Sequence, residues 1–240
     1  MSTSALTVQP TNKTARVAGA LYLLASIPAG FGTLYVPRAL IVRGNAAATA
    51  QNILASEMLF RLGIVSELLA AVGFIFVVRA LYRLLNGVDK RLASLMVTLV
   101  LVSIPISFVN VLNQIAALSL LRGGGYLSIF DQQQREALAM LFLDLHRQGL
   151  LVAAIFWGLW LFPFGVLVMR SGFLPRILGV LLIVNGFAYP VVSLTAFLLP
   201  SYVSMVSRFA LIAELGELWM IAWLLIKGAG VQRLAAAPAR

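Results

Sequence analysis

Three glutamates stand inside long apolar stretches of the chain. Glu67 lies within residues 58–82, and Glu214 and Glu217 lie within residues 207–226. A carboxylate near the centre of a bilayer costs about 2.5–3.5 kcal/mol, so such residues mark proton relays, ion sites or structural contacts between helices. Glu214 and Glu217 are three residues apart and share one helix face, so both cannot ionise there at low cost.

Other polar residues occur at similar depth in the expected helices. At about 1.5 Å of rise per residue, Arg61 and Arg208 lie near the outer surface, and the amides of residues 110, 113 and 114 and the imidazole of His146 lie in the same half of the membrane. We therefore predict an outward-facing polar pocket lined by Arg61, Glu67, Asn110, Asn113, His146, Arg208, Glu214 and Glu217.

The residue types and motifs that the sequence lacks exclude several kinds of site for such a pocket. The sequence has no cysteine and one histidine, which excludes thiolate zinc sites, cysteine nucleophiles and a haem held by two imidazoles of one chain. It also contains no G-x-S-x-G, phosphate-loop, Rossmann or EF-hand spacing. We therefore expect no cofactor, no metal and no catalytic residue, and we favour binding or movement of a small molecule or lipid head group, coupled to protons through the glutamates.

Two alternatives stay open at this point. The first is an intramembrane enzyme that uses His146 as a base together with the membrane glutamates, which requires a water-filled path between them. The second is a structural or regulatory membrane subunit, in which Glu67 and Glu214 hold the helices together by hydrogen bonds or by pairing with Arg208 and Arg61.

The composition indicates the elements that position these residues. With 61% hydrophobic and 11% charged residues and a mean hydropathy of +0.98, the chain lies far outside the range of soluble domains. Six segments are long and apolar enough to cross a bilayer as helices, at about 17–36, 58–82, 92–120, 149–169, 177–199 and 207–226. The sequence predicts an all-α integral membrane protein, a single domain of residues 1–240 with six transmembrane helices in three hairpins.

The basic residues are distributed unevenly over the two sides of this topology. The side with both termini carries eleven of the 18 basic residues and one of the eight acidic residues, whereas the other side carries seven of each. The positive-inside rule therefore places both termini, with tails 1–15 and 228–240, in the cytoplasm. It also accounts for the net charge of +10 without a nucleic-acid partner. The expected partner is the lipid bilayer, and the sequence also allows a small molecule or lipid as ligand and a homo-oligomer.

The outer connections contain helix signals of their own. Asn45 is a good N-cap for a helix over residues 46–56. Residues 132–148 have the length and composition of an amphipathic helix on the outer face, preceded by three glycines. The alternative for these residues is a long extension of the fourth transmembrane helix.

One spacing occurs twice in the chain. Met58-x-x-Arg61 is followed six residues after the arginine by Glu67, and Met205-x-x-Arg208 is followed at the same distance by Glu214. This pattern predicts a parallel internal repeat of the first and third hairpins.

Several motifs together resemble one family. They are Gly44-Asn45-Ala46-Ala47-Ala48-Thr49-Ala50-x-Asn52-Ile53, Phe60-Arg61-Leu62-Gly63, Arg16-x-x-Gly19-x-Leu21-Tyr22, Leu145-His146-x-x-Gly149, Ser171-Gly172-Phe173-Leu174-Pro175-Arg176 and Glu214-x-x-Glu217-x-Trp219. Over nearly its whole length the chain resembles the bacterial membrane family catalogued as domain of unknown function 4386. The resemblance implies a six-helix protein of the bacterial inner membrane and no assigned activity. Asn45 and Trp160 depart from the family pattern, which commonly has aspartate and often a second histidine there.

Overall fold

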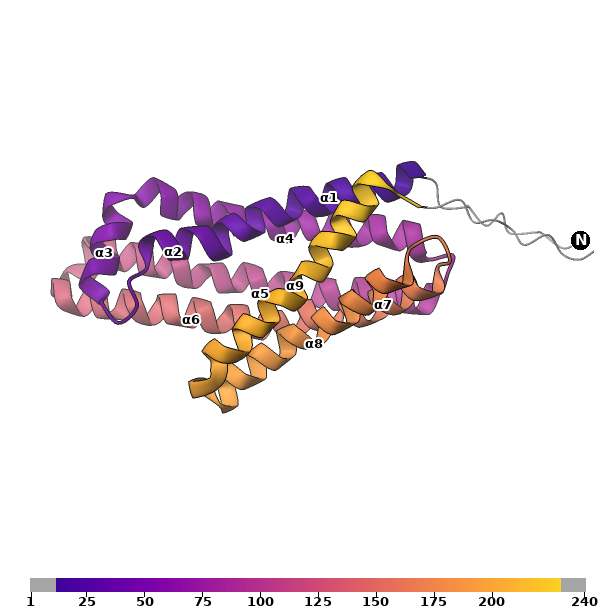
Figure 1. Ribbon diagram of the computed structural model, residues 1–240. Coiled ribbons are helices and arrows are strands. Elements are labelled where there is room, and N and C mark those ends of the chain that lie inside the picture. Colours follow the sequence, from indigo (N-terminus) through magenta and orange to yellow (C-terminus); the bar gives the residue numbers. More distant parts are fainter. Residues whose placement is uncertain (1–11, 230–240) are drawn as a thin grey trace, which may run out of the picture.

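The computed structural model describes residues 12–229, and each regular element in that range is a helix (Figure 1). The elements are α1 (Asn12–Gly30), the π-helical turn η1 (Phe31–Tyr35), α2 (Val36–Leu40), α3 (Ala46–Ala55), α4 (Glu57–Leu85), α5 (Lys90–Arg122), the 3-10 turn η2 (Gly125–Ile129), α6 (Gln132–Leu159), α7 (Leu161–Arg170), α8 (Arg176–Leu198), the 3-10 turn η3 (Pro200–Tyr202) and α9 (Val203–Ile226).

Within residues 12–229, six helical spans are long and apolar enough to cross a membrane. They are Asn12–Leu40, Glu57–Leu85, Lys90–Arg122, Gln132–Arg170, Arg176–Leu198 and Pro200–Ile226. The prediction of an all-α membrane protein with six membrane-crossing helices is confirmed. The first span begins inside the expected tail 1–15, and residues 1–11 and 230–240 of the two expected tails lie outside the described residues.

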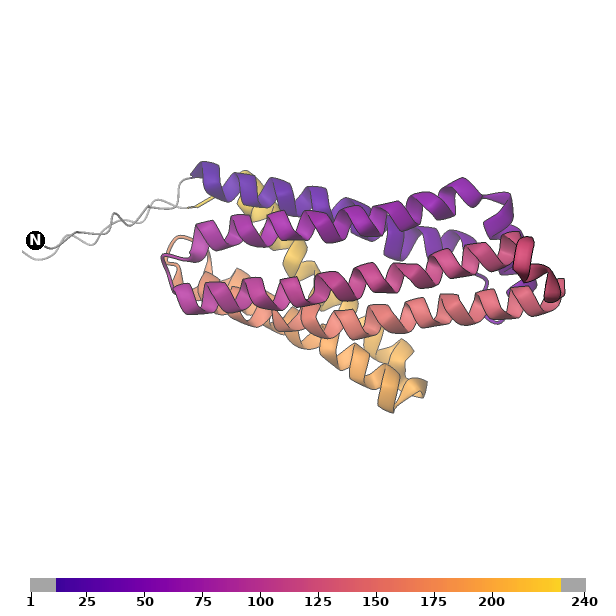
Figure 2. The same ribbon diagram turned by 180° about the vertical axis from the view of Figure 1, so that it is seen from behind.

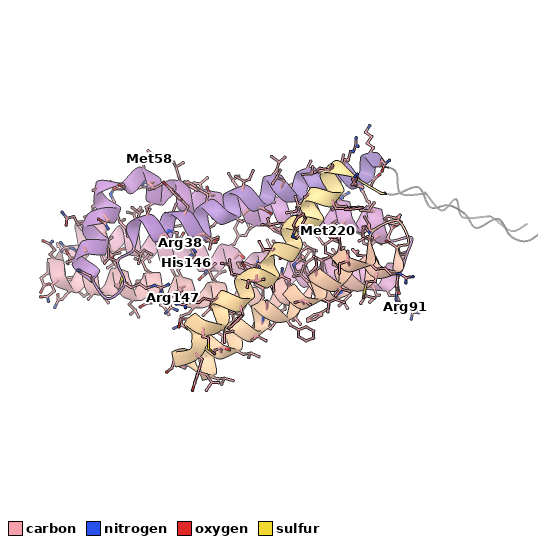
Figure 3. All side chains as sticks on the ribbon, in the orientation of Figure 1. Arg38, Met58, Arg91, His146, Arg147 and Met220 are labelled. Atoms are coloured by element: carbon pink, nitrogen blue, oxygen red, sulfur yellow. The ribbon has the colours of Figure 1, made fainter. Side chains whose placement is uncertain are left out.

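Four long helical spans run alongside one another, and the last two helices cross them obliquely. Figure 1 shows α1 with α2, and α4, α5 and α6, as a long bundle, with α9 passing diagonally to reach the beginning of α1. Figure 2 shows α5 and α6 side by side along their length. We call the end with α3 the α3 end, and the end where α1 begins and α9 ends the terminal end. Met58 lies near the α3 end and Arg91 at the terminal end (Figure 3).

Local capping signals set the beginnings of three helices. The Asn45 side chain accepts a hydrogen bond from the backbone nitrogen of Ala48 at 2.9 Å, which confirms the predicted N-cap of α3. Asp89 caps α5 by accepting from two backbone nitrogens at 3.0 and 3.1 Å. Asp131 and Gln134 form a capping box at the beginning of α6.

The predicted separate amphipathic helix over residues 132–148 is wrong. These residues form the first half of α6, which continues without a break to Leu159, so the alternative of an extended fourth helix is the observed one. The reason is packing: Leu143 and His146 are buried against the neighbouring helices. Gly149, where the predicted fourth segment begins, lies inside α6 and lets the Asn110 side chain of α5 approach the backbone of α6.

The apolar core is divided into two parts along the bundle. One cluster lies toward the terminal end and includes Tyr22, Phe164 and Met220, all almost fully buried. The other lies toward the α3 end and includes Ile53 and Phe60. The buried polar residues described next pack between helices that contribute to these two clusters.

Candidate functional site

A buried polar triad joins α4, α5 and α6. It consists of Glu67, Gln114 and His146, whose exposed fractions are 8%, 4% and 5%. The Gln114 Nε2 amide donates to Glu67 Oε1 at 2.8 Å and lies 3.0 Å from His146 Nε2. His146 Nε2 itself lies 3.4 Å from Glu67 Oε1. One side chain from each of three helices therefore meets at a single point inside the bundle, where Figure 3 places His146.

The hydrogen bonds around the imidazole fix which ring nitrogen carries the hydrogen. His146 Nδ1 faces the backbone carbonyl of Asn110 at 3.3 Å, and a carbonyl only accepts. Nδ1 therefore donates, so in the neutral ring Nε2 is an acceptor directed toward Glu67 and Gln114. A second hydrogen bond joins the same two residues, because Asn110 Nδ2 donates to the backbone carbonyl of His146 at 2.9 Å. Together the two bonds hold α5 against α6.

Two glycines leave the room that this triad needs. A Cβ on Gly32, in the π-helical turn η1, would lie 2.6 Å from Glu67 Cγ and 2.8 Å from the backbone oxygen of Gly63. A Cβ on Gly149 would overlap the Asn110 side chain. The backbone of the first membrane span at Gly32 thus packs closely against the Glu67 side chain.

A second, half-buried carboxylate has a separate set of partners. Glu217 of α9 accepts hydrogen bonds from the Tyr22 hydroxyl of α1, from Asn185 Nδ2 of α8 at 2.7 Å and from the Tyr189 hydroxyl at 3.1 Å. We call these four residues the Glu217 cluster. Its hydrogen bonds share no residue with the triad, so Glu67 and Glu217 belong to separate polar groups. All three donors are neutral, and they stabilise the carboxylate without a basic residue.

A third polar group lies at the α3 end, where α4 begins and α5 ends. Glu57 Oε1 accepts from Arg61 Nε at 2.7 Å, and Glu57 Oε2 lies 3.7 Å from Arg122 Nε. A cavity of about 280 Å3 lies beside them, lined by Arg61, Ile64 and Val65 of α4 and by Ile115, Leu118, Ser119 and Arg122 of α5.

The eight predicted site residues do not form one pocket. Glu67, Asn110 and His146 lie together, and Asn113 joins them through hydrogen bonds from its Nδ2 to Asn110 at 3.1 and 3.2 Å. The other four lie elsewhere: Arg61 beside the cavity, Glu217 in its own cluster, Glu214 half-buried on α9, and Arg208 exposed near the beginning of α9. Among the described residues Arg61 pairs with Glu57, and neither Arg61 nor Arg208 pairs with a membrane glutamate.

Some residues of these groups were outside the predicted set. Gln114 was recognised as a polar residue of the same membrane half but was not included in the pocket. Tyr22, Asn185 and Tyr189 were missed; Tyr22 carried a signal through its place in the Arg16-x-x-Gly19-x-Leu21-Tyr22 motif, and Asn185 is a lone amide in an apolar segment. Within residues 12–229, no three histidine, aspartate or glutamate side chains gather as a metal site would require.

Comparison with known proteins gives one match. Residues 17–228 match the model of a family described as Domain of unknown function (DUF4386). No curated protein and no solved structure matches the chain. Because the family model covers most of the 240 residues, the chain is a member of the DUF4386 family of membrane-spanning helical proteins.

Proposed function

We propose that the protein binds a proton at the Glu67–Gln114–His146 triad and couples its uptake to the binding or movement of a small molecule or lipid head group. The observation that supports this most is the 3.4 Å separation of two buried titratable groups, Glu67 Oε1 and His146 Nε2, on different helices. Ionisable pairs inside a membrane domain commonly form proton relays.

The hydrogen bonds define what one proton would change. With Glu67 ionised and His146 neutral, both facing atoms are acceptors, and the two hydrogens of Gln114 Nε2 serve one each. An added proton replaces this bridge by a direct hydrogen bond between Glu67 and His146 and releases one N–H of Gln114. Because the three residues belong to α4, α5 and α6, proton uptake changes a contact between three membrane helices.

The unpartnered oxygen of Gln114 supports the same proposal. Gln114 Oε1 is buried and has no hydrogen-bond partner among the described residues. A buried acceptor without a partner costs about 1–3 kcal/mol, so rotation of the Gln114 amide is favourable when a hydrogen-bond donor becomes available to its oxygen. The proton bound between Glu67 and His146 supplies one such donor, which can bond Gln114 Oε1 as an alternative to the direct bond within the pair.

We further propose that the terminal end faces the cytoplasm of a bacterial inner membrane. The support is the charge distribution, since eleven of the 18 basic residues and only one of the eight acidic residues fall on the side with the two termini. In that orientation the triad receives its proton through the external half of the membrane, from outside the cell.

Because His146 is the only histidine, nuclear magnetic resonance can follow the triad directly. The full chain, labelled with 15N-histidine and freed of any histidine tag, is titrated in lipid nanodiscs. We expect the Nδ1–H tautomer, because Nδ1 faces the backbone carbonyl of Asn110. In Glu67→Gln the 15N signals of His146 are expected to shift, because the carboxylate 3.4 Å from Nε2 becomes an amide.

A transport assay connects the proton to function. Proteoliposomes with an internal pH dye are tested for proton uptake with wild type, Glu67→Gln and, as a control on a half-buried glutamate outside the triad, Glu136→Gln. Loss of uptake in Glu67→Gln alone supports the proposal. Proton uptake that is unchanged in Glu67→Gln would show that the triad is only structural.

The enzyme alternative receives no such support. It requires a water-filled path that joins His146 to the membrane glutamates. His146 and Glu67 are in contact, but neither lines the 280 Å3 cavity, and Glu217 is held in a different cluster.

A further inference from the structure

We infer that the cavity between α4 and α5 is a binding site for an anionic phospholipid, with the head-group phosphate on Arg61 and Arg122 and an acyl chain along the groove below. This site is separate from the triad and does not depend on the function proposed for it. Antiparallel packing places it at the α3 end, because Arg61 lies one turn into α4 and Arg122 is the last residue of α5.

The charges of this site are unbalanced by one. Two guanidinium groups share the single carboxylate of Glu57, at 2.7 and 3.7 Å through their Nε atoms. Among the described residues, no acceptor forms a hydrogen bond with the terminal nitrogens of Arg61 or Arg122. The remaining charge of +1 and the free N–H groups match one phosphodiester, which guanidinium groups bind with two parallel hydrogen bonds.

The lining below the arginines is apolar apart from Ser119, whose hydroxyl is bonded to the Ile115 carbonyl, and it faces outward. Ile64 and Val65 lie one turn deeper than Arg61, and Leu118 and Ile115 lie one and two turns deeper than Arg122. At 1.5 Å per residue, the groove reaches about 10 Å from Arg122 toward the middle of the membrane. Val65 and Ile115 are 48% and 44% exposed, so the groove opens sideways into the hydrocarbon region.

This combination selects a lipid over a soluble anion. A water-soluble phosphate would use the two arginines but would leave the apolar groove empty. A phospholipid fills both parts and reaches the groove laterally from the bilayer. Basic residues at the membrane surface each favour anionic lipid by roughly 1 kcal/mol, which corresponds to a factor of about five in affinity per residue.

Native mass spectrometry of the full chain in detergent tests the assignment. The probes are phosphatidylglycerol, phosphatidylcholine and glycerol phosphate, which has the phosphate but no acyl chain. We expect phosphatidylglycerol to bind at least about tenfold more tightly than the other two. The double variant Arg61→Gln/Arg122→Gln should lose this preference. The control Arg38→Gln/Arg147→Gln removes the same charge from two exposed arginines and should keep it.

A second variant tests the groove without touching the charges. In Val65→Trp an exposed residue is enlarged so that its side chain fills the cavity. This variant should weaken the binding of phosphatidylglycerol and leave the binding of glycerol phosphate unchanged. Equal binding of glycerol phosphate and phosphatidylglycerol would identify a soluble anion as the ligand and overturn the proposal. Equal loss in both arginine double variants, or no effect of Val65→Trp, would also overturn it.

Discussion

The substitution Gly32→Ala is expected to disrupt the Glu67–Gln114–His146 triad, although the first membrane span contributes no side chain to it. The new Cβ would lie 2.6 Å from Glu67 Cγ and 2.8 Å from the Gly63 oxygen, against about 3.5–4.0 Å for an unstrained carbon contact. The Gly63 oxygen belongs to the backbone of α4, so relief requires a movement of roughly 1 Å between two helices or a new position of the Glu67 side chain.

The size of the effect follows from these two responses. Overpacking in a protein interior costs about 1–3 kcal/mol, and loss of the 2.8 Å hydrogen bond from Gln114 to the Glu67 carboxylate costs about 1.5–3 kcal/mol. We expect Gly32→Ala to lower the free energy of unfolding by about 2–4 kcal/mol. Gly30 is a matched control two residues earlier, because nothing lies within 4 Å of a Cβ there. Gly30→Ala should raise stability by up to about 1 kcal/mol through helix propensity.

Both variants can be compared by unfolding in mixed micelles with increasing sodium dodecyl sulfate, followed by circular dichroism. The 15N signal of His146 provides a local measure in the same samples, and it should shift in Gly32→Ala and stay unchanged in Gly30→Ala. Equal stability of the two variants, with the His146 signal unmoved in both, would refute the reasoning that η1 holds Glu67 in place.

Three further changes test other contacts. Tyr22→Phe removes one of the donors to Glu217 and should lower the free energy of unfolding by about 1.5–3 kcal/mol in the same micelle assay, whereas no loss would mean that Asn185 and Tyr189 suffice. Asp89→Ala removes the cap of α5 and should cost about 1 kcal/mol, and an unchanged midpoint would contradict this role. Gly149→Ala should separate α5 from α6 by displacing Asn110, measured as faster hydrogen exchange at the amides of α6; protection equal to wild type would count against it.

The sequence was sufficient for features that depend on local or strongly repeated signals. The six membrane-crossing helices follow from long apolar runs, and the Asn45 cap follows from one residue and its neighbours. The joining of Glu67, Asn110 and His146 was also predictable in part, because each is a rare polar residue at a similar depth.

The Glu217 cluster could not be predicted in the same way. Tyr22 and Glu217 are 195 residues apart, and their contact depends on α9 crossing to α1 rather than packing along the bundle. A tyrosine in an apolar segment is also hard to distinguish from an ordinary aromatic packing residue, and its hydroxyl acquires meaning only when the partner is known. The continuity of α6 was left as the alternative because the long apolar run begins only at residue 149, and the small size of Gly149 serves a helix contact inside α6.

The π-helical turn η1 gives the first span one residue more than an α-helix of the same length needs. Such an inserted residue rotates the side chains before the turn by about 100° around the helix axis relative to those after it. Tyr22, on one side of η1, binds Glu217, and Val36, on the other side, packs against Gly63 one turn before Glu67. Both contacts exist together only with the extra residue in place. If Thr33 were deleted from η1, the first span could keep either the Tyr22–Glu217 contact or the Val36–Gly63 contact, but not both. The extra residue in η1 therefore sets the rotation that lets one helix reach both the triad and the Glu217 cluster.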